Sequence, residues 1–307
     1  MRENSFLSLG PHGFHRIAYT ESGSPDNPHA VVCVHGLTRN SRDFDFLAMA
    51  LANDCHVVCP DVAGRGKSDW LAHSEDYSYP VYLSDMAALI ARIGPGTRVS
   101  RFIARLLRRP SVRYVDWVGT SMGGLIGMML AAQPKSPIRR LVMNDVGWLV
   151  PANALNILSD YVGKDPRYAS IEQFEADFRK VYSTFGPLTE AQWRHLITHT
   201  VRRFDDGSYG FKYDPKIGEP FKRKFFQDLD LWNIWSNVRC PVLILRGAQS
   251  DFLLKETAAK MCERKAHTEL VEFSGIGHAP MLMSEDQIKI VRDFLLAPDS
   301  SIPVSTG

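Results

Sequence analysis

The chain has 307 residues and a nearly balanced charge, with 36 Lys and Arg against 34 Asp and Glu, which argues against a general nucleic-acid binder. Hydrophobic residues make up 45% and charged residues 23%, as in an ordinary globular protein that forms one large domain or a core with an insertion. No run of about 18 apolar residues predicts a transmembrane helix, and the first residues lead into no apolar signal segment, so we expect no integral membrane association.

Short apolar runs and amphipathic stretches alternate through the first half of the chain. The continuous apolar run at residues 30–34 is typical of a central strand that is covered on both faces. In chain order the pattern predicts strands at 6–9, 16–20 and 30–34, a helix at 43–52, a strand at 56–59, a helix at 79–93, a strand at 112–118, a helix at 122–132 and a strand at 140–144.

The same alternation returns near the C-terminus. It predicts a strand at 242–245, a helix at 255–262, a strand at 269–273 and a helix at 285–296. Short buried strands that alternate with helices indicate an α/β fold, a doubly wound and mostly parallel sheet with right-handed connections.

Residues 148–235 interrupt this alternation. They contain helical stretches at 171–183 and 190–204, several aromatic residues and no strong buried strand. The sequence therefore predicts a core domain of residues 1–147 and 236–307 with a helical cap inserted at 148–235. A cap at this point would lie over the strand ends, where open α/β sheets bind ligands.

A second unusual segment, residues 97–113, carries six arginines and no acidic residue. It could form a surface helix that meets an anionic membrane or a partner. Because the segment is short and has few apolar residues, we favour a solvated insertion. The arginines are Arg98, Arg101, Arg105, Arg108, Arg109 and Arg113.

The five cysteines form no C-x-x-C pair, and their number is odd. They are typical of small buried hydrophobic residues in a reducing compartment, so we expect a cytoplasmic protein without a disulfide framework. No H-E-x-x-H motif or tight His/Cys/carboxylate cluster suggests a metal site, and we expect no cofactor. The cysteines are Cys33, Cys55, Cys59, Cys240 and Cys262.

The segment Gly119-Thr120-Ser121-Met122-Gly123 matches G-x-S-x-G between a predicted strand and a predicted helix. Glycines at 119 and 123 stand where side chains would collide with neighbouring backbone. Such a turn pushes the serine hydroxyl out of the sheet and aims the first helix amides at the group it attacks. Ser121 is therefore the candidate nucleophile.

This layout resembles the α/β-hydrolase superfamily, and the resemblance covers nearly the whole chain. In that superfamily a serine turn is followed by a cap insertion, by an acid after a later strand and by a histidine after the last strand. The resemblance implies hydrolysis through a serine, a histidine and an acid, with no cofactor.

The base and the acid can each be sought at their expected places. His278 lies in the Gly-rich segment 274–280 directly after the last predicted strand, so it is the candidate base that takes the serine proton. Asp251 follows the predicted strand 242–245 and is the favoured acid, which would hold the imidazole in the correct tautomer. Asp145 is the alternative acid, because it ends the strand after the serine helix, where some relatives carry the acid.

Two backbone amides are expected to form an oxyanion hole, those of Met122 and Leu37. His35 resembles the histidine that orients this loop in the superfamily without transferring a proton, and Gly36 is the loop's single glycine. The segment 61–68 resembles the superfamily's D-x-x-G-x-G-x-S turn, and we interpret it as structural because no G-x-G-x-x-G motif is present.

A serine at the turn favours acyl transfer to water through an acyl-serine. We therefore predict a hydrolase of small or medium carboxylic esters, with Trp148 as a candidate pocket residue close to a strand end. The alternatives are a carbon–carbon bond hydrolase of a 1,3-diketone-like ring-cleavage product, a lactonase, a thioesterase and a cofactor-free perhydrolase. A ligand receptor that has kept the triad is the alternative from another functional class.

Overall fold

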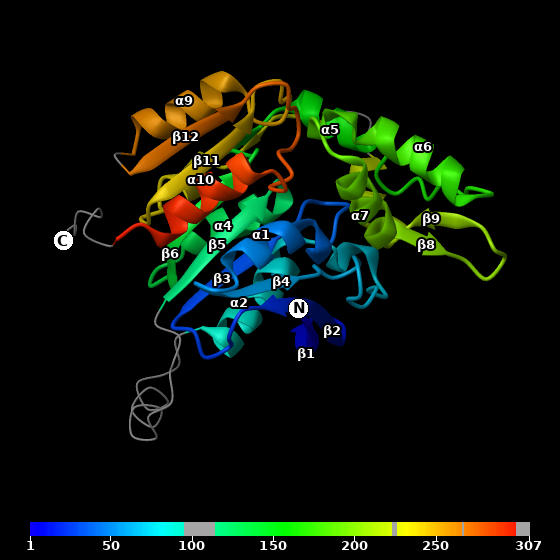
Figure 1. The fold of residues 1–307 in the computed structure, drawn as a ribbon, viewed down its shortest axis with the longest axis horizontal. Helices are drawn as coiled ribbons and strands as arrows, with labels where there is room; N and C mark the ends of the chain where they lie inside the picture. Colours follow the sequence, from blue (N-terminus) through cyan, green and yellow to red (C-terminus); the bar gives the residue numbers. More distant parts are fainter. Residues whose placement is uncertain (95–113, 223–225, 266, 299–307) are drawn as a thin grey trace.

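The computed structural model describes residues 1–94, 114–222, 226–265 and 267–298, so the arginine-rich segment at 97–113 lies outside the described residues. In the described part, eight strands form one sheet in the order β1-β2-β4-β3-β5-β6-β11-β12 (Figure 1). All pairs from β4 to β12 are parallel, and β1 and β2 are antiparallel. The predicted doubly wound, mostly parallel α/β sheet is confirmed. The strands are β1 (Arg2–Gly10), β2 (Gly13–Ser22), β3 (His29–Val34), β4 (His56–Pro60), β5 (Tyr114–Thr120), β6 (Ile138–Asn144), β11 (Val242–Gly247) and β12 (Thr268–Phe273).

Both faces of the sheet are buried, because alternate residues of the central strands point to opposite sides. In β3, Val31 and Cys33 join one core cluster, whereas Val32 and Val34 join the other. The first cluster includes side chains of α1 (Asp45–Leu51) and α10 (Glu285–Leu296). The second includes side chains of α2 (Tyr79–Ile93), α4 (Met122–Ala131) and α9 (Lys255–Glu263). Continuous apolar runs were therefore the correct signal for these strands.

A helical insertion around residues 152–222 projects from one side of the sheet domain (Figure 1, green). The domain boundaries at 148 and 235 stay a prediction. At the root of the insertion, β7 (Leu149–Val150) pairs with β10 (Leu229–Asp230), which joins the outgoing and returning chain. The inserted elements are α5 (Ala152–Ser159), α6 (Ile171–Val181), η3 (Ser183–Phe185), α7 (Glu190–Thr200), β8 (Val201–Arg203), β9 (Tyr209–Phe211) and η4 (Pro215–Lys222), and α8 (Trp232–Trp235) follows.

One predicted element of the insertion was too long. The helix expected at 190–204 begins at its Thr189 capping box but ends at Thr200, because Val201 takes an extended backbone. β8 then pairs with β9 as a hairpin, and Gly207 supplies the positive φ of 85° in the connection. Elsewhere the differences are small; the helix expected at 43–52 divides into η1 (Ser41–Phe44) and α1.

Ser74–Asp76 forms a short 3₁₀ helix, η2, before α2. Among the helices of the described residues, none combines the length and the apolar character that crossing a membrane requires.

Candidate active site

Ser121 lies at the tip of the sharp turn between β5 and α4, with φ 52° and ψ −117°. A non-glycine residue rarely takes a positive φ, and such strain is typical of a nucleophile elbow. Glycine is required at both flanking positions, because a side chain there would collide with neighbouring backbone atoms. A Cβ on Gly119 would lie 2.2 Å from the Gly123 carbonyl oxygen, and one on Gly123 would lie 2.0 Å from the Val34 oxygen. The neighbouring backbone therefore leaves no room for a side chain at either position.

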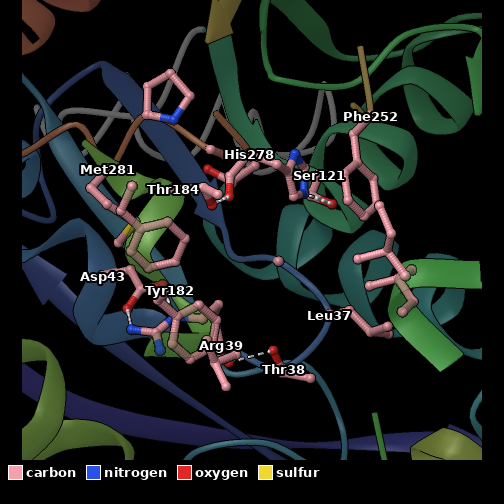
Figure 2. Close-up of a pocket in the computed structure, with 18 of the residues that line it drawn as sticks. Leu37, Thr38, Arg39, Asp43, Ser121, Tyr182, Thr184, Phe252, His278 and Met281 are labelled. Carbon is pink, nitrogen blue, oxygen red and sulfur yellow. Dashed lines mark hydrogen bonds and ion pairs between the residues drawn. The ribbon is translucent and has the colours of Figure 1, made fainter. Parts of the chain in front are cut away.

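The imidazole of His278 lies beside the serine hydroxyl (Figure 2). Its Nε2 is 2.9 Å from Ser121 Oγ, although the residues are 157 positions apart. The segment after β12 carries the histidine to this place. The ring of Phe252 stacks on the imidazole, with centroids 3.8 Å apart and planes inclined by 17°. The pair has the geometry of a nucleophile with an adjacent general base.

The acid beside His278 is Asp145 and not Asp251. His278 Nδ1 lies 2.8 Å from Asp145 Oδ2. Asp251 is exposed at the lining of the same cavity, and its carboxylate is not a hydrogen-bond partner of His278 among the described residues. The structure therefore brings Asp145, the alternative acid of the sequence analysis, against the imidazole in place of the favoured Asp251.

Burial explains this difference between the two carboxylates. Asp145 directly follows β6 and is fully buried. The amide of Gly247 donates to its Oδ1 at 2.8 Å, and the hydroxyl of Ser250 donates to its Oδ2 at 2.5 Å. A buried carboxylate needs such donors. The loop after β11 thus contributes to the acid through Ser250, one residue before Asp251.

The loop after β3 is held by His35, as expected for a residue that transfers no proton. Its Nδ1 donates to the Gly36 carbonyl at 2.7 Å, and its Nε2 accepts from the Val62 amide at 3.0 Å. Burial lowers the pKa of His35 to about 3, so the ring is neutral at ordinary pH. Both ring nitrogens are thus engaged in fixing the loop that carries Leu37.

Leu37 borders the same cavity as Ser121, and Met122 begins α4 next to the serine. In the described part of the chain, neither backbone amide donates a hydrogen bond to another residue. Such amides, one at the N-terminus of a helix and one in an adjacent loop, are suited to bind a developing oxyanion.

A cavity of about 160 Å³ opens beside Ser121 and His278, between the core loops and the insertion. It is smaller than the roughly 300–1,000 Å³ of pockets for drug-sized ligands. The core contributes Leu37, Thr38, Arg39, Asp251, Phe252 and Met281, among others, and the insertion contributes Ile157, Leu158, Tyr161, Val181, Tyr182, Thr184 and Phe185.

Residues 31–290 match the profile described as "Alpha/beta hydrolase family". The chain is 43% identical over 294 residues to a 3-hydroxybutyrate-oligomer hydrolase of Cupriavidus necator, which covers 93% of this chain and 94% of the relative. The chain belongs to the alpha/beta hydrolase family.

Two further comparisons agree with this membership. An esterase of Mycobacterium tuberculosis is 25% identical over 258 residues, covering 80% of this chain and 76% of the relative. The crystal structure of an alpha/beta hydrolase from Novosphingobium aromaticivorans superimposes with a TM-score of 0.80 at 32% identity, covering 95% of this chain and 98% of that one. The fold and the general class of activity, a hydrolase, are therefore established for this chain.

The turn at 61–68 connects neighbouring loops through one buried carboxylate. Asp61 is buried, and its carboxylate accepts from the amides of Ser41 at 2.7 Å and Lys67 at 2.8 Å. The carboxylate thus holds the segment after β3 against the turn, which agrees with a structural interpretation of residues 61–68.

Trp148 does not line the cavity of this hydrolase, contrary to expectation. Its carbonyl accepts from the Leu231 amide at 2.7 Å, beside the pairing of β7 with β10. Its ring packs edge-on against Trp232, with centroids 5.1 Å apart. The residue is near a strand end in sequence, but the root of the insertion carries it away from the serine.

Asp45, His195 and His199 are the described residues whose donor atoms come close enough for a metal ion, within 4.8 Å of one another. This group does not border the catalytic cavity. The guanidinium of Arg42 already donates to both oxygens of Asp45, and His195 Nε2 contacts the Arg42 carbonyl at 2.9 Å. Asp45 and His195 thus already have partners within the protein, so we assign no ion to this group.

Sequence reasoning missed several residues of the site. Arg39 is buried and pairs with Asp43 through two hydrogen bonds of 2.9 and 2.7 Å. Tyr182 and Thr184 come from the insertion, and no sequence motif indicated that this part of the chain would lie beside the catalytic loops. An arginine with an aspartate four residues later beside the His35 loop was the one signal available for the buried pair.

Proposed function

We propose that this chain is a serine carboxylic-ester hydrolase that cleaves short oligomers of hydroxy acids such as 3-hydroxybutyrate. The contact of Ser121 Oγ with His278 Nε2, continued by His278 Nδ1 to Asp145, is the observation that carries the proposal. The name of the relative at 43% identity, a 3-hydroxybutyrate-oligomer hydrolase, supports the substrate class.

In the first half of the reaction, His278 Nε2 takes the hydroxyl proton while Ser121 Oγ attacks the ester carbonyl carbon. The carbonyl oxygen becomes an oxyanion, which the amides of Leu37 and Met122 stabilise. As the tetrahedral intermediate collapses, the bond from the carbonyl carbon to the alcohol oxygen breaks. The departing oxygen takes the proton from His278, which leaves an acyl-serine and a free alcohol.

In the second half, water replaces the alcohol. His278 Nε2 takes a proton from the water as the water oxygen attacks the acyl carbon, and it returns this proton to Ser121 Oγ when the ester bond to the serine breaks. Asp145 holds the imidazole with Nδ1 protonated and stabilises the imidazolium in both halves. The carboxylic acid and the original enzyme are the products.

The cavity supports a small acyl group, and its polar groups suit a substrate with repeated ester oxygens. About 160 Å³ accommodates a short branched acyl unit better than a long alkyl chain. Thr38 and Gln249 are polar residues at its lining, among apolar neighbours such as Leu158. A short hydroxy-acid ester combines both features.

The test is turnover by the purified protein. Dimers and trimers of 3-hydroxybutyrate and p-nitrophenyl butyrate are compared with a dienoic 1,3-diketone, with product acids measured by chromatography. We expect hydrolysis of the oligomers and the nitrophenyl ester and none of the diketone, and Ser121→Ala should lose at least about 10⁴-fold in kcat. Cleavage of the diketone without turnover of either ester would contradict the proposal.

A further inference from the structure

The insertion contacts both loops that complete the site, through one short segment, residues 182–186, which we name the cap bridge. It comprises Tyr182 at the end of α6, the turn η3 and Gly186. Figure 2 shows Tyr182 beside Arg39 and Thr184 beside His278, so the segment reaches both sides of the pocket. An insertion that only covered the substrate would not need to contact both the Leu37 loop and the His278 loop.

On one side the cap bridge holds the loop that carries Leu37. The hydroxyl of Tyr182 lies 3.0 Å from Thr38 Oγ1, and both residues are buried. The guanidinium carbon of Arg39 lies 4.9 Å from the centroid of the Tyr182 ring, within the range of a cation–π contact. Tyr182 therefore contacts the two residues that directly follow Leu37.

On the other side the cap bridge holds the segment that carries His278. The Gly277 amide donates to the Thr184 carbonyl at 2.7 Å, and the Thr184 hydroxyl donates to the His278 carbonyl at 2.9 Å. Thr184 thus binds one backbone group on each side of the His278 Cα. Two anchors around one residue restrict its backbone more than a single contact does.

Among the described residues, the core holds the backbone of the segment 276–280 by hydrogen bonds at its two ends. The Ile276 carbonyl accepts from the Gln249 amide at 2.9 Å, and the Pro280 carbonyl accepts from Asn144 Nδ2 at 2.7 Å. Between these anchors, the Gly277 amide and the His278 carbonyl both bind Thr184. The insertion therefore supplies the backbone contacts nearest to the catalytic imidazole.

Close packing reinforces these hydrogen bonds. A Cβ on Gly277 would lie 2.9 Å from the Cβ of Thr184, and one on Gly186 would lie 2.6 Å from Cγ1 of Ile276. The two segments thus touch where glycine leaves no side chain between them. Such contact transmits small displacements, because packed groups cannot shift independently.

We propose that Thr184 is a positioning residue for His278 and Tyr182 a positioning residue for the Leu37 loop, so that the docked insertion completes the catalytic geometry. This inference rests on the proposed esterase mechanism. The Nε2-to-Oγ distance of 2.9 Å is maintained in part from the insertion, and loss of the Thr184 hydroxyl slows the chemical step without weakening substrate binding.

The decisive variants are Thr184→Val, which keeps the branched shape but lacks the hydroxyl, and Thr184→Ser, which keeps the hydroxyl. Ser183→Ala is the matched control, because Ser183 is an exposed neighbour in the same turn. Steady-state kinetics with p-nitrophenyl butyrate are measured beside the rate of covalent labelling by a fluorophosphonate, which reports serine reactivity without the ester.

We expect Thr184→Val to lower kcat and the labelling rate by roughly three- to tenfold, the effect of one hydrogen bond, with KM within about twofold of wild type. Thr184→Ser should restore both rates, and Ser183→Ala should match wild type. Tyr182→Phe should lower kcat in the same way. Melting temperatures should stay unchanged for the Thr184 variants, since the side chain is exposed.

An unchanged kcat in Thr184→Val would overturn the inference, as would a rise in KM alone, which would make Thr184 a substrate contact. Failure of the proposed function gives a different result. Wild-type protein would then turn over no ester, while its labelling rate and that of Thr184→Val would still report whether Thr184 positions the imidazole.

Discussion

Asp145 Oδ2 lies 2.8 Å from His278 Nδ1, across 133 positions of the chain. The aspartate stands at the end of β6, and the histidine follows β12, with β11 paired between the two strands. The loop that leaves β11 closes over the acid by presenting the Gly247 amide and the Ser250 hydroxyl. Three strand ends therefore cooperate to hold one imidazole tautomer.

The first prediction compares substitutions of the two candidate acids. Asp145→Asn should lower kcat for p-nitrophenyl butyrate by on the order of 10⁴-fold, because an amide cannot hold Nδ1 protonated or stabilise the imidazolium. Asp251→Asn is the matched control and should stay within about threefold of wild type, since its exposed carboxylate does not contact His278. A large loss in Asp251→Asn with little loss in Asp145→Asn would restore the original assignment.

The sequence singled out one serine and one histidine, but it favoured Asp251 as the acid, whereas Asp145 lies against the imidazole. Ser121 and His278 each have one place in the pattern, a glycine-flanked turn and a glycine-rich segment after the last strand. Asp145 and Asp251 both follow strands that are direct neighbours, with Asn144 paired to Leu245, so both reach the same edge of the sheet. Burial distinguishes them, and burial depends on packing that no local pattern encodes. The immediate succession of Asp145 after its strand was the available hint.

The second prediction concerns space around the nucleophile turn. Gly123→Ala should lower the free energy of unfolding by at least about 3 kcal/mol, since the new Cβ would lie 2.0 Å from the Val34 oxygen. Gly36→Ala is the control, because a Cβ there meets its nearest atoms at an ordinary 3.7 Å. Urea denaturation should leave Gly36→Ala unchanged or more stable by up to about 1 kcal/mol. Equal stabilities for the two variants would refute the steric argument.

The third prediction is a pH dependence of stability. Burial lowers the pKa of His35 from 6.5 to about 3, so between these values the unfolded chain binds a proton that the folded chain does not. Lowering the pH from 7 to 5 should therefore remove about 2 kcal/mol of unfolding free energy through this residue. Urea unfolding at pH 7 and at pH 5 measures this loss of unfolding free energy.

The His35→Gln variant isolates this contribution, because glutamine does not titrate. The variant should have a lower free energy of unfolding than wild type at pH 7. When the pH is lowered to 5, this free energy should fall by about 2 kcal/mol less than that of wild type. If wild type and His35→Gln lost the same free energy, the lowered pKa would be excluded.

The insertion shows where local patterns stop being informative. The sequence located its approximate extent from the loss of strand alternation, and the helix at 171–183 was close to α6. It did not predict the β8–β9 hairpin or the packing of Trp148 on Trp232, because both depend on partners that the chain meets only after folding. Thr184 lacks any motif, and its importance lies in contacts 94 positions away.

The last prediction concerns the buried pair of Arg39 and Asp43, whose guanidinium also faces the rings of Phe178 and Tyr182. Arg39→Met should lower the free energy of unfolding by roughly 3–5 kcal/mol, because it leaves an unpaired carboxylate in a mostly buried place. The double variant Arg39→Met with Asp43→Leu should recover much of this loss, since apolar groups need no partner. Arg16→Met removes an exposed arginine from Asp69 and should cost under about 1 kcal/mol. A double variant no more stable than Arg39→Met in urea denaturation would show that the arginine acts through its aromatic contacts and not by neutralising Asp43.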